Sequence, residues 1–474
     1  MKALLAVAGA LILLAGCASV QTDTEWQRTQ QFSRDAVGVE AQWVQTEEDE
    51  RRVQAAVQLL LKDGMSSDDA VRIALMNNPM LQAAFEDIGI AKADLVQAGL
   101  FTNPNLSGLL QFPFHGKGKY VDADGVFLLS DFWQIPLRKK VAAAQRDAAL
   151  LRVNAEIVAI AAEAKKSYHT YASARSMATD MQQLKDELRR WEEHLTYRER
   201  FGFAGELDLL HSAAAVRNGK VRAARFMRDL RAAEIQLLRA TGLVGARSFE
   251  LAIDKEKISM PVALPAEEVL ITHAFARRPD LQLSKARVGE ADRLLALERA
   301  LIFKNVGAGA SYSHEPKNEN RLGPSVSLQL PIFDQNQAQI AKAEYRKRQA
   351  EKELTGRMVL VREEIGMTCA TLDALQAELL LLRDEVLPLR ERAAAFAEKY
   401  FNAMQISMLP LLEARQQLLE TKLRLLETQK EYYAAFVELE RLIGGRFPDG
   451  VQPLEPAKEK KEDTQKESVH QHHH

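Results

Sequence analysis

The chain has 474 residues and a formal net charge of −2 at pH 7, from 63 basic and 65 acidic residues. This balance gives no reason to expect a nucleic-acid partner, because such a partner favours a clustered basic excess. Charged residues make up 27% of the chain, and its long stretches rich in Ala, Leu, Glu, Arg and Gln favour long helices.

The N-terminus has the pattern of a secretion signal. Lys2 supplies a positive end, and residues 3–14 form an apolar run too short to span a bilayer as a helix. The run ends in Leu14-Ala15-Gly16-Cys17, which resembles a bacterial lipobox. We therefore expect a signal peptide over 1–16 and acylation, such as palmitate, at Cys17; the alternative is an ordinary signal peptide with a chance Cys. No Asp follows Cys17, which favours the outer membrane.

The rest of the chain offers no other anchor. Cys369 lies in a helical heptad stretch and is best interpreted as a small buried apolar residue. No run of 18 apolar residues follows the signal segment, so we expect no transmembrane helix. Any membrane-spanning segment must then be β.

An internal repeat organises the chain. Four landmarks recur in the same order about 200 residues later, which is far longer than a solenoid period and indicates a duplication. The pairs are Asn78-Pro79 with Arg278-Pro279, Pro136 with Pro331, Leu209-Leu210 with Leu411-Leu412, and Gly242 with Gly444. We divide the chain into a lipidated N-terminal extension (17–65), a first repeat (66–243), a linker (244–265), a second repeat (266–445) and a charged, disordered tail (446–474).

Each repeat has the same predicted elements. A helix (67–100 or 266–303) precedes two strands, and Pro136 or Pro331 then ends the strand region before a very long helix begins. The long helix stops at a short break (202–205 or 402–407), and a shorter helix returns (207–240 or 409–442). The four predicted strands are 105–114, 125–133, 306–314 and 325–333.

The second long helix carries an extended coiled-coil pattern. Apolar residues step by 4 and 3 without a break from Leu354 to Tyr400, which predicts a left-handed supercoil. Pro388 falls inside this run and should kink the helix or loosen a turn. We call the following positions the heptad seam: Leu354, Met358, Val361, Ile365, Thr368, Leu372, Leu375, Leu379, Leu382, Val386, Leu389, Ala393, Phe396 and Tyr400.

Helix lengths predict how the repeats combine. Each long helix spans roughly 100 Å at 1.5 Å per residue, and two shorter helices placed end to end match it. We expect 207–240 and 266–303 to balance the first long helix. Likewise, 409–442 and 67–100 should balance the second, so that the two ends of the chain complete each other's stack.

The four strands cannot stand alone in lipid, because an open sheet leaves unpaired N–H and C=O groups at its edges. They must close with strands of other copies, and their length suits a tilted barrel strand. Aromatic residues in and near them could form an interfacial girdle or a sandwich core. They are Phe112, Phe114, Tyr120, Phe127, Phe132, Trp133, Tyr312 and Phe333.

Over 67–445 the chain resembles the TolC-like outer-membrane efflux proteins, in their lipoprotein branch. The resemblance rests on the duplicated element order, Arg278-Pro279-Asp280-Leu281, Leu330-Pro331-Ile332-Phe333-Asp334 and Leu411-Leu412-Glu413-Ala414-Arg415. The first repeat departs from these motifs in detail, which weakens transfer of residue roles there.

The resemblance implies a mainly α fold with a small β part. Duplicated coiled-coil hairpins would form a periplasmic tunnel, and four strands per protomer would join a 12-stranded transmembrane barrel in a homotrimer. It also implies an outer-membrane location, a periplasmic adaptor, an inner-membrane pump, and passive export of drugs or metal ions. A periplasmic adaptor or a structural coiled-coil lipoprotein is the alternative function.

The hairpin breaks lie furthest from the strands and are the expected periplasmic gate. Candidate gate residues are Glu206, Asp208, Gln405, Ser407 and Glu413. Carboxylates in a narrow threefold ring would attract cations and repel anions. The competing interpretation is that Glu206 and Asp208 cap the returning helix.

The sequence shows no phosphate loop, nucleophile elbow or paired-Cys metal motif, so we expect no enzyme activity, metal or cofactor. His169, His194 and His211 are expected to be ordinary helix residues. Met76 with Met80, and Met404 with Met408, could bind a soft metal but more simply pack in cores. The tail residues His470, His472, His473 and His474 could be a tag or a natural metal-collecting tail.

Overall fold

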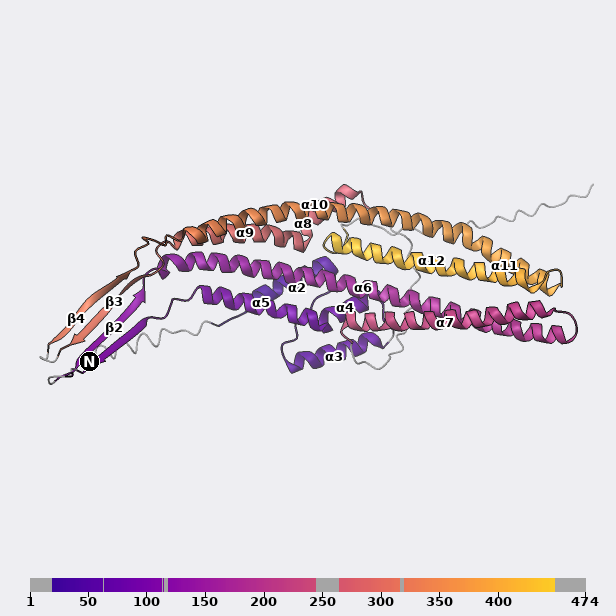
Figure 1. The fold of residues 1–474 in the computed structure, drawn as a ribbon, viewed down its shortest axis with the longest axis horizontal. Helices are drawn as coiled ribbons and strands as arrows, with labels where there is room; N and C mark the ends of the chain where they lie inside the picture. The colour runs from indigo at the N-terminus through magenta and orange to yellow at the C-terminus, as the bar shows by residue number, and fades with distance from the viewer. Residues whose placement is uncertain are drawn as a thin grey trace, which may run out of the picture.

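The structure is a computed structural model that describes residues 19–62, 64–112, 114, 118–243, 264–315 and 319–447. It is elongated, with long helices side by side and four strands at one end (Figure 1). Cys17, residues 244–263 of the linker and the four tail histidines lie outside the described residues.

The two repeats have the same element order. The elements of the first repeat are α4 (Ser67–Asn77), α5 (Pro79–Ala98), β1 (Asn105–Gln111), β2 (Tyr120–Leu128), α6 (Asp131–Arg200) and α7 (Glu206–Thr241). Those of the second are α8 (Glu267–Arg277), α9 (Pro279–Ala300), β3 (Val306–His314), β4 (Asn320–Leu328), α10 (Gln337–Leu381), the π-helix η1 (Leu382–Val386), α11 (Leu387–Asn402) and α12 (Met408–Leu442).

The first helix of each repeat is broken, where the sequence predicted one continuous helix. In the first repeat, Asn78 has an extended backbone and its side-chain oxygen accepts from the backbone N–H of Met80 at 2.9 Å. Pro79 then occupies the first position of α5, where a missing N–H costs little. Arg278 and Pro279 break the second repeat at the same place.

The predicted strands are confirmed in number and order, but two of their positions are wrong. β3 has the predicted bounds, whereas β2 and β4 lie about five residues before 125–133 and 325–333. In the first repeat the difference arises because α6 begins at Asp131, before Pro136. The buried Asp131 carboxylate accepts from the backbone N–H of Thr102 at 2.6 Å and pairs with Arg138 at 2.7 Å, which fixes the helix start.

The end-to-end stacking of helices differs from the prediction. The end of α7 meets the α4–α5 junction of its own repeat, where Asn78 Nδ2 donates to the carbonyl of Ala240 at 2.9 Å. The end of α12 likewise meets the α8–α9 junction, because a Cβ on Gly444 would lie 2.9 Å from the Cα of Arg278. Each repeat therefore completes its own stack, and the expected exchange between the chain ends is wrong.

The reason is the left-handed turn that ends each returning helix. Gly242 and Gly444 have φ of 75° and 88°, a conformation that glycine adopts without steric cost. A Cβ on Gly242 would lie 2.4 Å from the carbonyl oxygen of Asn77, so the turn also needs a residue without a side chain. The close approach joins the turn to the junction of its own repeat.

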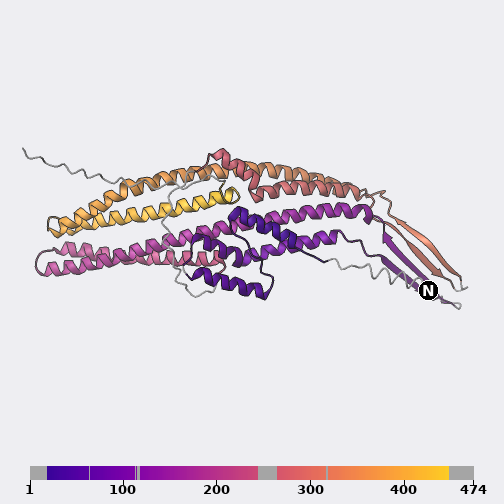
Figure 2. The same cartoon turned by 180° about the vertical axis from the view of Figure 1, so that it is seen from behind.

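The repeats lie side by side along α6, as Figures 1 and 2 show from opposite sides. Helix α6 packs against α4, α5 and α7 of its own repeat and also against α9 and α12 of the other. Helix α12 packs in turn against α10 and α11. The order across the hairpin half is therefore α7, α6, α12, α11, which leaves α7 and α11 at the two flanks.

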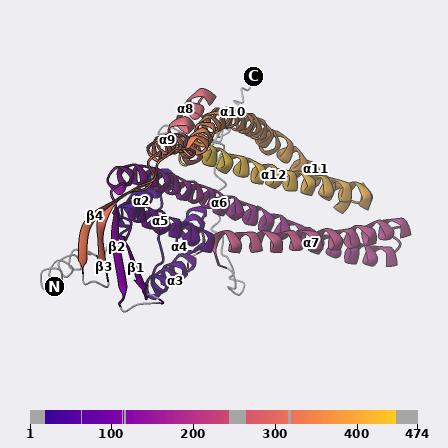
Figure 3. The same cartoon turned by 60° about the vertical axis from the view of Figure 1, so that its left-hand side comes forward.

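Two N-terminal helices, α2 (Asp23–Val37) and α3 (Glu47–Leu61), cover the middle of the first repeat, and the sequence did not predict them (Figure 3). Glu25 of α2 is buried and pairs with Lys92 and Arg146 at 2.9 and 3.3 Å. The carbonyl of Ala36 accepts from the backbone N–H of Arg446 at 2.7 Å. Residue 446, assigned to the disordered tail, is therefore bound to the N-terminal segment.

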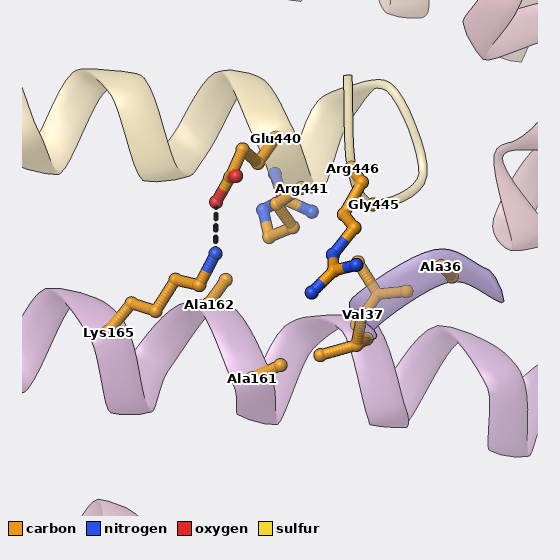
Figure 4. Close-up of a pocket in the computed structure, with 10 residues that line it drawn as sticks. Ala36, Val37, Ala161, Ala162, Lys165, Glu440, Arg441, Gly445 and Arg446 are labelled. Carbon is orange, nitrogen blue, oxygen red and sulfur yellow. Dashed lines mark hydrogen bonds and ion pairs between the residues drawn. The ribbon is translucent and has the colours of Figure 1, made fainter. Parts of the chain in front are cut away.

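Figure 4 shows the pocket at this contact, where α2, α6 and the end of α12 meet. Lys165 of α6 and Glu440 of α12 form an ion pair of 2.7 Å beside it. The pocket thus lies where the N-terminal segment joins the first repeat to the second.

Of the two effects expected of Pro388, the loosened turn is confirmed: the π-helix η1 ends at Val386, two residues before it. Before η1 the heptad seam is buried at Val361, Ile365, Leu372 and Leu379, against α8 and α12. Beyond η1 the expectation of an unbroken seam is wrong, because the later seam residues face outward and Ala394 and Phe401 are buried instead.

One helical stretch in the described part of the chain is apolar and long enough to cross a membrane by length and composition. It is 337–402, with an 18-residue window of mean hydropathy 1.4. Only 22% of that window is buried within the chain. The sequence led us to expect no such stretch.

Candidate functional site

The two hairpin tips lie at the end of the molecule furthest from the strands (Figure 1). The first tip runs from Phe201 to Gly205 between α6 and α7, and Gly202 turns the chain with φ of 77°. The second tip runs from Ala403 to Ser407 between α11 and α12, with Met404 at φ of 59°. The predicted breaks are therefore confirmed as the distal turns.

The tips are held to each other by an apolar cluster. Leu195 of the first hairpin and Phe401, Met408 and Leu411 of the second are all buried in it. Trp191 packs edge-on against Phe401 with ring centroids 5.3 Å apart, and the Arg198 guanidinium lies 4.9 Å from the same ring. The two tips therefore form one unit within the protomer.

The candidate gate residues all lie at this end of the molecule. Glu206 is exposed, whereas Asp208 is half-buried and its carboxylate accepts from the backbone N–H of Gly205 at 3.4 Å. That contact is the one expected of a residue that caps α7. The side chains of Gln405, Ser407 and Glu413 are exposed. Their part in a gate remains a prediction.

Exposed apolar side chains around the tips were not singled out from the sequence. Phe201 and Phe203 flank the first turn and are 60% and 64% exposed. Large apolar groups gathered at one exposed place mark a surface that meets another molecule. The sequence did carry a signal for this exposed apolar surface, Phe201-Gly202-Phe203. Aromatic side chains on either side of a turn glycine lie beyond the helix ends, so they cannot pack between the two helices. The other exposed members are Tyr197, Leu207, Leu210, Tyr400, Met404 and Leu409.

At the opposite end the four strands form one antiparallel sheet in the order β1-β2-β3-β4. Its register pairs Leu106 with Gly125, and Ala123 with Tyr312, so these residues share one face. The face is apolar except at one end, where His314 of β3 and Asn320 of β4 lie beside Val121. Its apolar members and glycines are Leu106, Gly108 and Leu110 on β1, Val121, Ala123, Gly125 and Phe127 on β2, Val306, Ala308, Ala310 and Tyr312 on β3, and Leu322, Pro324, Val326 and Leu328 on β4.

The opposite face of the sheet is mostly polar. Asp122 pairs across the strands with Ser313, and Asp124 with Ser311. Arg321 of β4 lies on the same face and forms ion pairs with Glu315 and Glu319. One apolar and one polar face on strands of seven to nine residues is the pattern of a wall between lipid and water.

The sheet is open within the described chain, since β1 and β4 each pair on one side only. No second sheet covers it among the described residues, so the sandwich interpretation of the aromatic residues is wrong. Most of these side chains are exposed, and they lie toward both ends of the sheet. Phe112 and Phe114 are 68% and 103% exposed beyond β1, and Phe132 and Phe333 are 62% and 92% exposed where the strands meet the long helices.

Between the two ends, the Arg-Pro-Asp motif forms an ion cluster around a buried arginine, Arg278. Arg278 is 2% exposed, and its guanidinium pairs with Asp280 and with Glu364 of α10, both at 2.8 Å. Arg357 of α10 also pairs with Asp280. Burial alone would raise the pKa of Asp280, but the hydrogen bonds and charges of Arg278 and Arg357 hold it below its usual value.

The remaining candidate ligands do not come together. Among the described residues no group of three or more His, Cys, Asp or Glu side chains could hold a metal ion. Met76 and Met408 are buried in core clusters, whereas their partners Met80 and Met404 are 75% and 66% exposed. His169 stacks on Tyr433 of α12 with ring centroids 4.4 Å apart, and burial lowers its pKa to about 4, with a further contribution from Lys165.

Comparison with known proteins agrees with this geometry. Residues 270–445 match the family described as outer membrane efflux protein. The cobalt-zinc-cadmium resistance protein CzcC of Cupriavidus metallidurans is 26% identical over 206 residues, which are 43% of this chain. The match spans about half of that relative, 49% of its length.

Solved structures share the fold over most of the chain. A crystal structure of CusC, studied for its folding and transmembrane channel formation, has a TM-score of 0.68 and 17% identity, over 80% of this chain and 92% of that one. The CmeC outer membrane channel of Campylobacter jejuni has a TM-score of 0.68 and 14% identity, over 81% of this chain and 86% of that one. The predicted resemblance to TolC-like outer-membrane efflux proteins is thereby confirmed.

Proposed function

We propose that this protein is the outer-membrane channel subunit of a tripartite export system, and that three copies form a passive conduit for small solutes from the periplasm to the exterior. The observation that carries this proposal is the open four-stranded sheet with one apolar and one polar face. Such a sheet needs partner strands at both edges before it can lie in lipid.

Three copies would close the sheet into twelve strands. The apolar face would then meet lipid and the polar face would line a water-filled passage, as in larger membrane barrels. The long hairpins would continue the passage on the periplasmic side. A conduit of this kind needs no catalytic group, since the pump supplies the driving force.

The exposed apolar residues of the tips support a protein partner at the periplasmic end. A periplasmic adaptor could bury Phe201 and Phe203 and so link the channel to an inner-membrane pump. At the other end, acyl chains on Cys17 would hold the chain to outer-membrane lipid, since each buried methylene contributes about 0.8 kcal/mol. The alternative, an adaptor or a purely structural coiled coil, needs neither the duplication nor the two-faced sheet.

Metal cations are the cargo we would test first, ahead of drugs. Asp122 and Asp124 on the polar face would place carboxylates along the passage and favour cations over anions. The name of the relative CzcC, a cobalt-zinc-cadmium resistance protein, supports the same choice.

The first experiment is fractionation and native mass measurement of the membrane-extracted protein. We expect a trimer in the outer-membrane fraction that conducts ions in planar bilayers. A monomer that stays in the periplasmic fraction would rule out the channel. For the cargo, a deletion strain is tested against cobalt, zinc, cadmium and a panel of drugs. Sensitivity to drugs alone would contradict the metal proposal and leave the channel intact.

A further inference from the structure

A groove lies between α6 and α9, in the half of the molecule nearer to the strands, and the passage of solutes does not explain it. Its volume is about 490 Å³, which lies in the range of pockets that hold small molecules. It therefore offers an apolar surface beside charges of both signs. Its apolar lining is Leu137, Ala143 and Ala296, and its charged lining is Lys140, Asp147, Asp292 and Arg293.

Both carboxylates of the groove are engaged by cations from outside its lining. Asp292 pairs with Lys347 of α10 at 2.6 Å, and the hydrogen bond and charge of Lys347 hold the pKa of Asp292 below its usual value. Asp147 pairs with Arg146 at 2.7 Å. The negative charges that line the groove are therefore already balanced.

The two cations of the groove are not balanced in this way. Lys140 and Arg293 are both exposed, and neither forms an ion pair with a residue in the described part of the chain. The charge of Arg293 acts on Asp292, but that carboxylate is already paired with Lys347. The groove thus has a surplus of two positive charges, which favours an anionic ligand.

The groove opens on the face of the protomer that carries α2. Arg146, at the edge of the groove, also pairs with Glu25 in the first turn of α2 at 3.3 Å. At the other end of α2, Val37 lies beside Ala161 of α6 (Figure 4). Helix α2 therefore begins at its end nearer to the strands. The expected acylation of Cys17, six residues before α2, turns this face toward lipid and away from the passage.

The depth of the groove suits the headgroup layer of the membrane. Lys140 lies nine residues after the start of α6 at Asp131, and Arg293 lies seven residues before the end of α9 at Ala300. Both cations are therefore roughly 10–14 Å along their helices from the strands. Exposed Phe132 marks the interface there, and a headgroup layer is about 5–8 Å thick. Long basic side chains extend toward such an interface and so reach the phosphates.

We infer that this groove binds the headgroup of an anionic phospholipid in the periplasmic leaflet of the outer membrane. Lys140 and Arg293 bind the phosphate, since charged donors make strong hydrogen bonds to phosphate oxygens. Leu137 and Ala296 contact the glycerol and the first methylenes of the acyl chains. A free phosphate ion has the same charge but cannot use this apolar lining. The inference rests on the proposed outer-membrane location and adds a specific lipid site to it.

Lipid titration of the full-length trimer tests the site. The extracted protein is stripped of phospholipid and titrated with phosphatidylglycerol, or with zwitterionic phosphatidylcholine, while native mass spectrometry counts the bound lipids. Lys140→Gln with Arg293→Gln should weaken phosphatidylglycerol binding about 30-fold, the effect of two basic residues at an anionic surface. Binding of phosphatidylcholine should not change.

Lys342→Gln with Arg346→Gln is the matched control. These two residues are exposed near the start of α10, closer to the strands than Lys347, and they do not line the groove. The control variant should bind phosphatidylglycerol as the unmodified protein does. An equal loss in both variants would mean that lipid responds to the overall charge of the protein, and would overturn the site.

Photo-cross-linking locates the bound lipid and separates its source. A photoreactive phosphatidylglycerol should label 137–147 and 292–296, and a tenfold excess of inorganic phosphate should not prevent it. Protection by inorganic phosphate would assign the groove to free phosphate and overturn the lipid site. A native trimer in which the groove variant binds phosphatidylglycerol normally would overturn this inference and leave the channel standing. A native monomer in the periplasmic fraction would overturn both.

Discussion

The two repeats break their first helix at the same place but hold the break with different chemistry. In the first repeat, neutral Asn78 caps α5 and donates to the end of α7. In the second, buried Arg278 forms an ion cluster with partly exposed Asp280, Arg357 and Glu364. A duplicated fold therefore fixes where the junction must lie, while the bonds that hold it can be either neutral or ionic.

This contrast predicts unequal sensitivity to mutation. Replacement Arg278→Met should lower stability by about 3 kcal/mol, because it leaves Glu364 without its buried cation and weakens the support of Asp280. Because Arg357 still pairs with Asp280, the expected loss of stability lies at the lower end of the range seen when one partner of a buried ion pair is removed. Thermal unfolding of the purified protein measures the effect. Arg278→Lys is the control and should recover part of the loss, whereas an unchanged midpoint in Arg278→Met would show that the cluster contributes little.

The two repeats should also respond differently to acid. In the first repeat, Nε2 of His169 lies 3.5 Å from Ser67 Oγ at the start of α4, and the His169 ring stacks on Tyr433 of the second repeat. Burial and the charge of Lys165 lower the pKa of His169 to about 4, below its ordinary value of 6.5. The unfolded chain then binds more protons between these values, so stability is full above pH 6.5 and falls as the pH drops toward 4.

The expected acid effect is at most about 1.4 kcal/mol per pH unit in that window. His169→Phe keeps an aromatic ring for Tyr433 but cannot take up a proton. The unfolding midpoint of this variant should therefore change less between pH 6.5 and pH 4 than that of the unmodified protein. Asp280 of the second junction has a lowered pKa and stays ionised over the same range. An equally steep loss in His169→Phe would place the acid sensitivity elsewhere.

Asn78→Ala should be milder than Arg278→Met. It removes the cap on α5 and one donor to Ala240, which together are worth about 1–2 kcal/mol. The comparison uses the same unfolding measurement for both variants. If Asn78→Ala costs as much as Arg278→Met, the distinction between a neutral and an ionic junction fails.

The sequence predicted the repeat, the element order and the position of the tips because these depend on local signals. Proline and glycine mark helix ends and turns whatever the tertiary contacts are, as at Pro79, Pro279, Gly202 and Gly242. The breaks of the first helix at Pro79 and Pro279 also had a local signal, but they were not predicted. Tertiary contacts decided the other features that were wrong. The Asp131 carboxylate started α6 early and moved β2, and close approach of Gly242 and Gly444 joined each returning helix to its own repeat.

Two further features were not predicted, although α3 does begin with a local signal, the capping box of Thr46 and Asp49. The N-terminal helices α2 and α3 are short. The role of Glu25 as a buried ion-pair partner depends on Lys92 of α5 and Arg146 of α6, which only the folded structure brings to it. At the candidate gate, the sequence located both tips. It could not say which face of each helix turns inward, because η1 shifts that face by one residue.

The smallest effect concerns the candidate gate at the first tip. Asp208 accepts from the backbone N–H of Gly205, while Glu206 is exposed at the start of α7, where a negative charge favours the helix dipole. Glu206→Gln with Asp208→Asn should lower stability by roughly 1 kcal/mol if the two residues only cap the helix.

If they also form a threefold ring in a narrow passage, the same change should alter single-channel conductance and weaken block by divalent cations while the trimer persists. Glu431→Gln is the matched control, since its exposed carboxylate lies on α12 far from both tips and outside the α7 cap. Conductance that does not change in the double variant, together with a lowered unfolding midpoint, would leave these residues with the structural role alone. A changed conductance at an unchanged midpoint would instead favour the gate, because a cap that contributes to folding must lower the midpoint when it is removed.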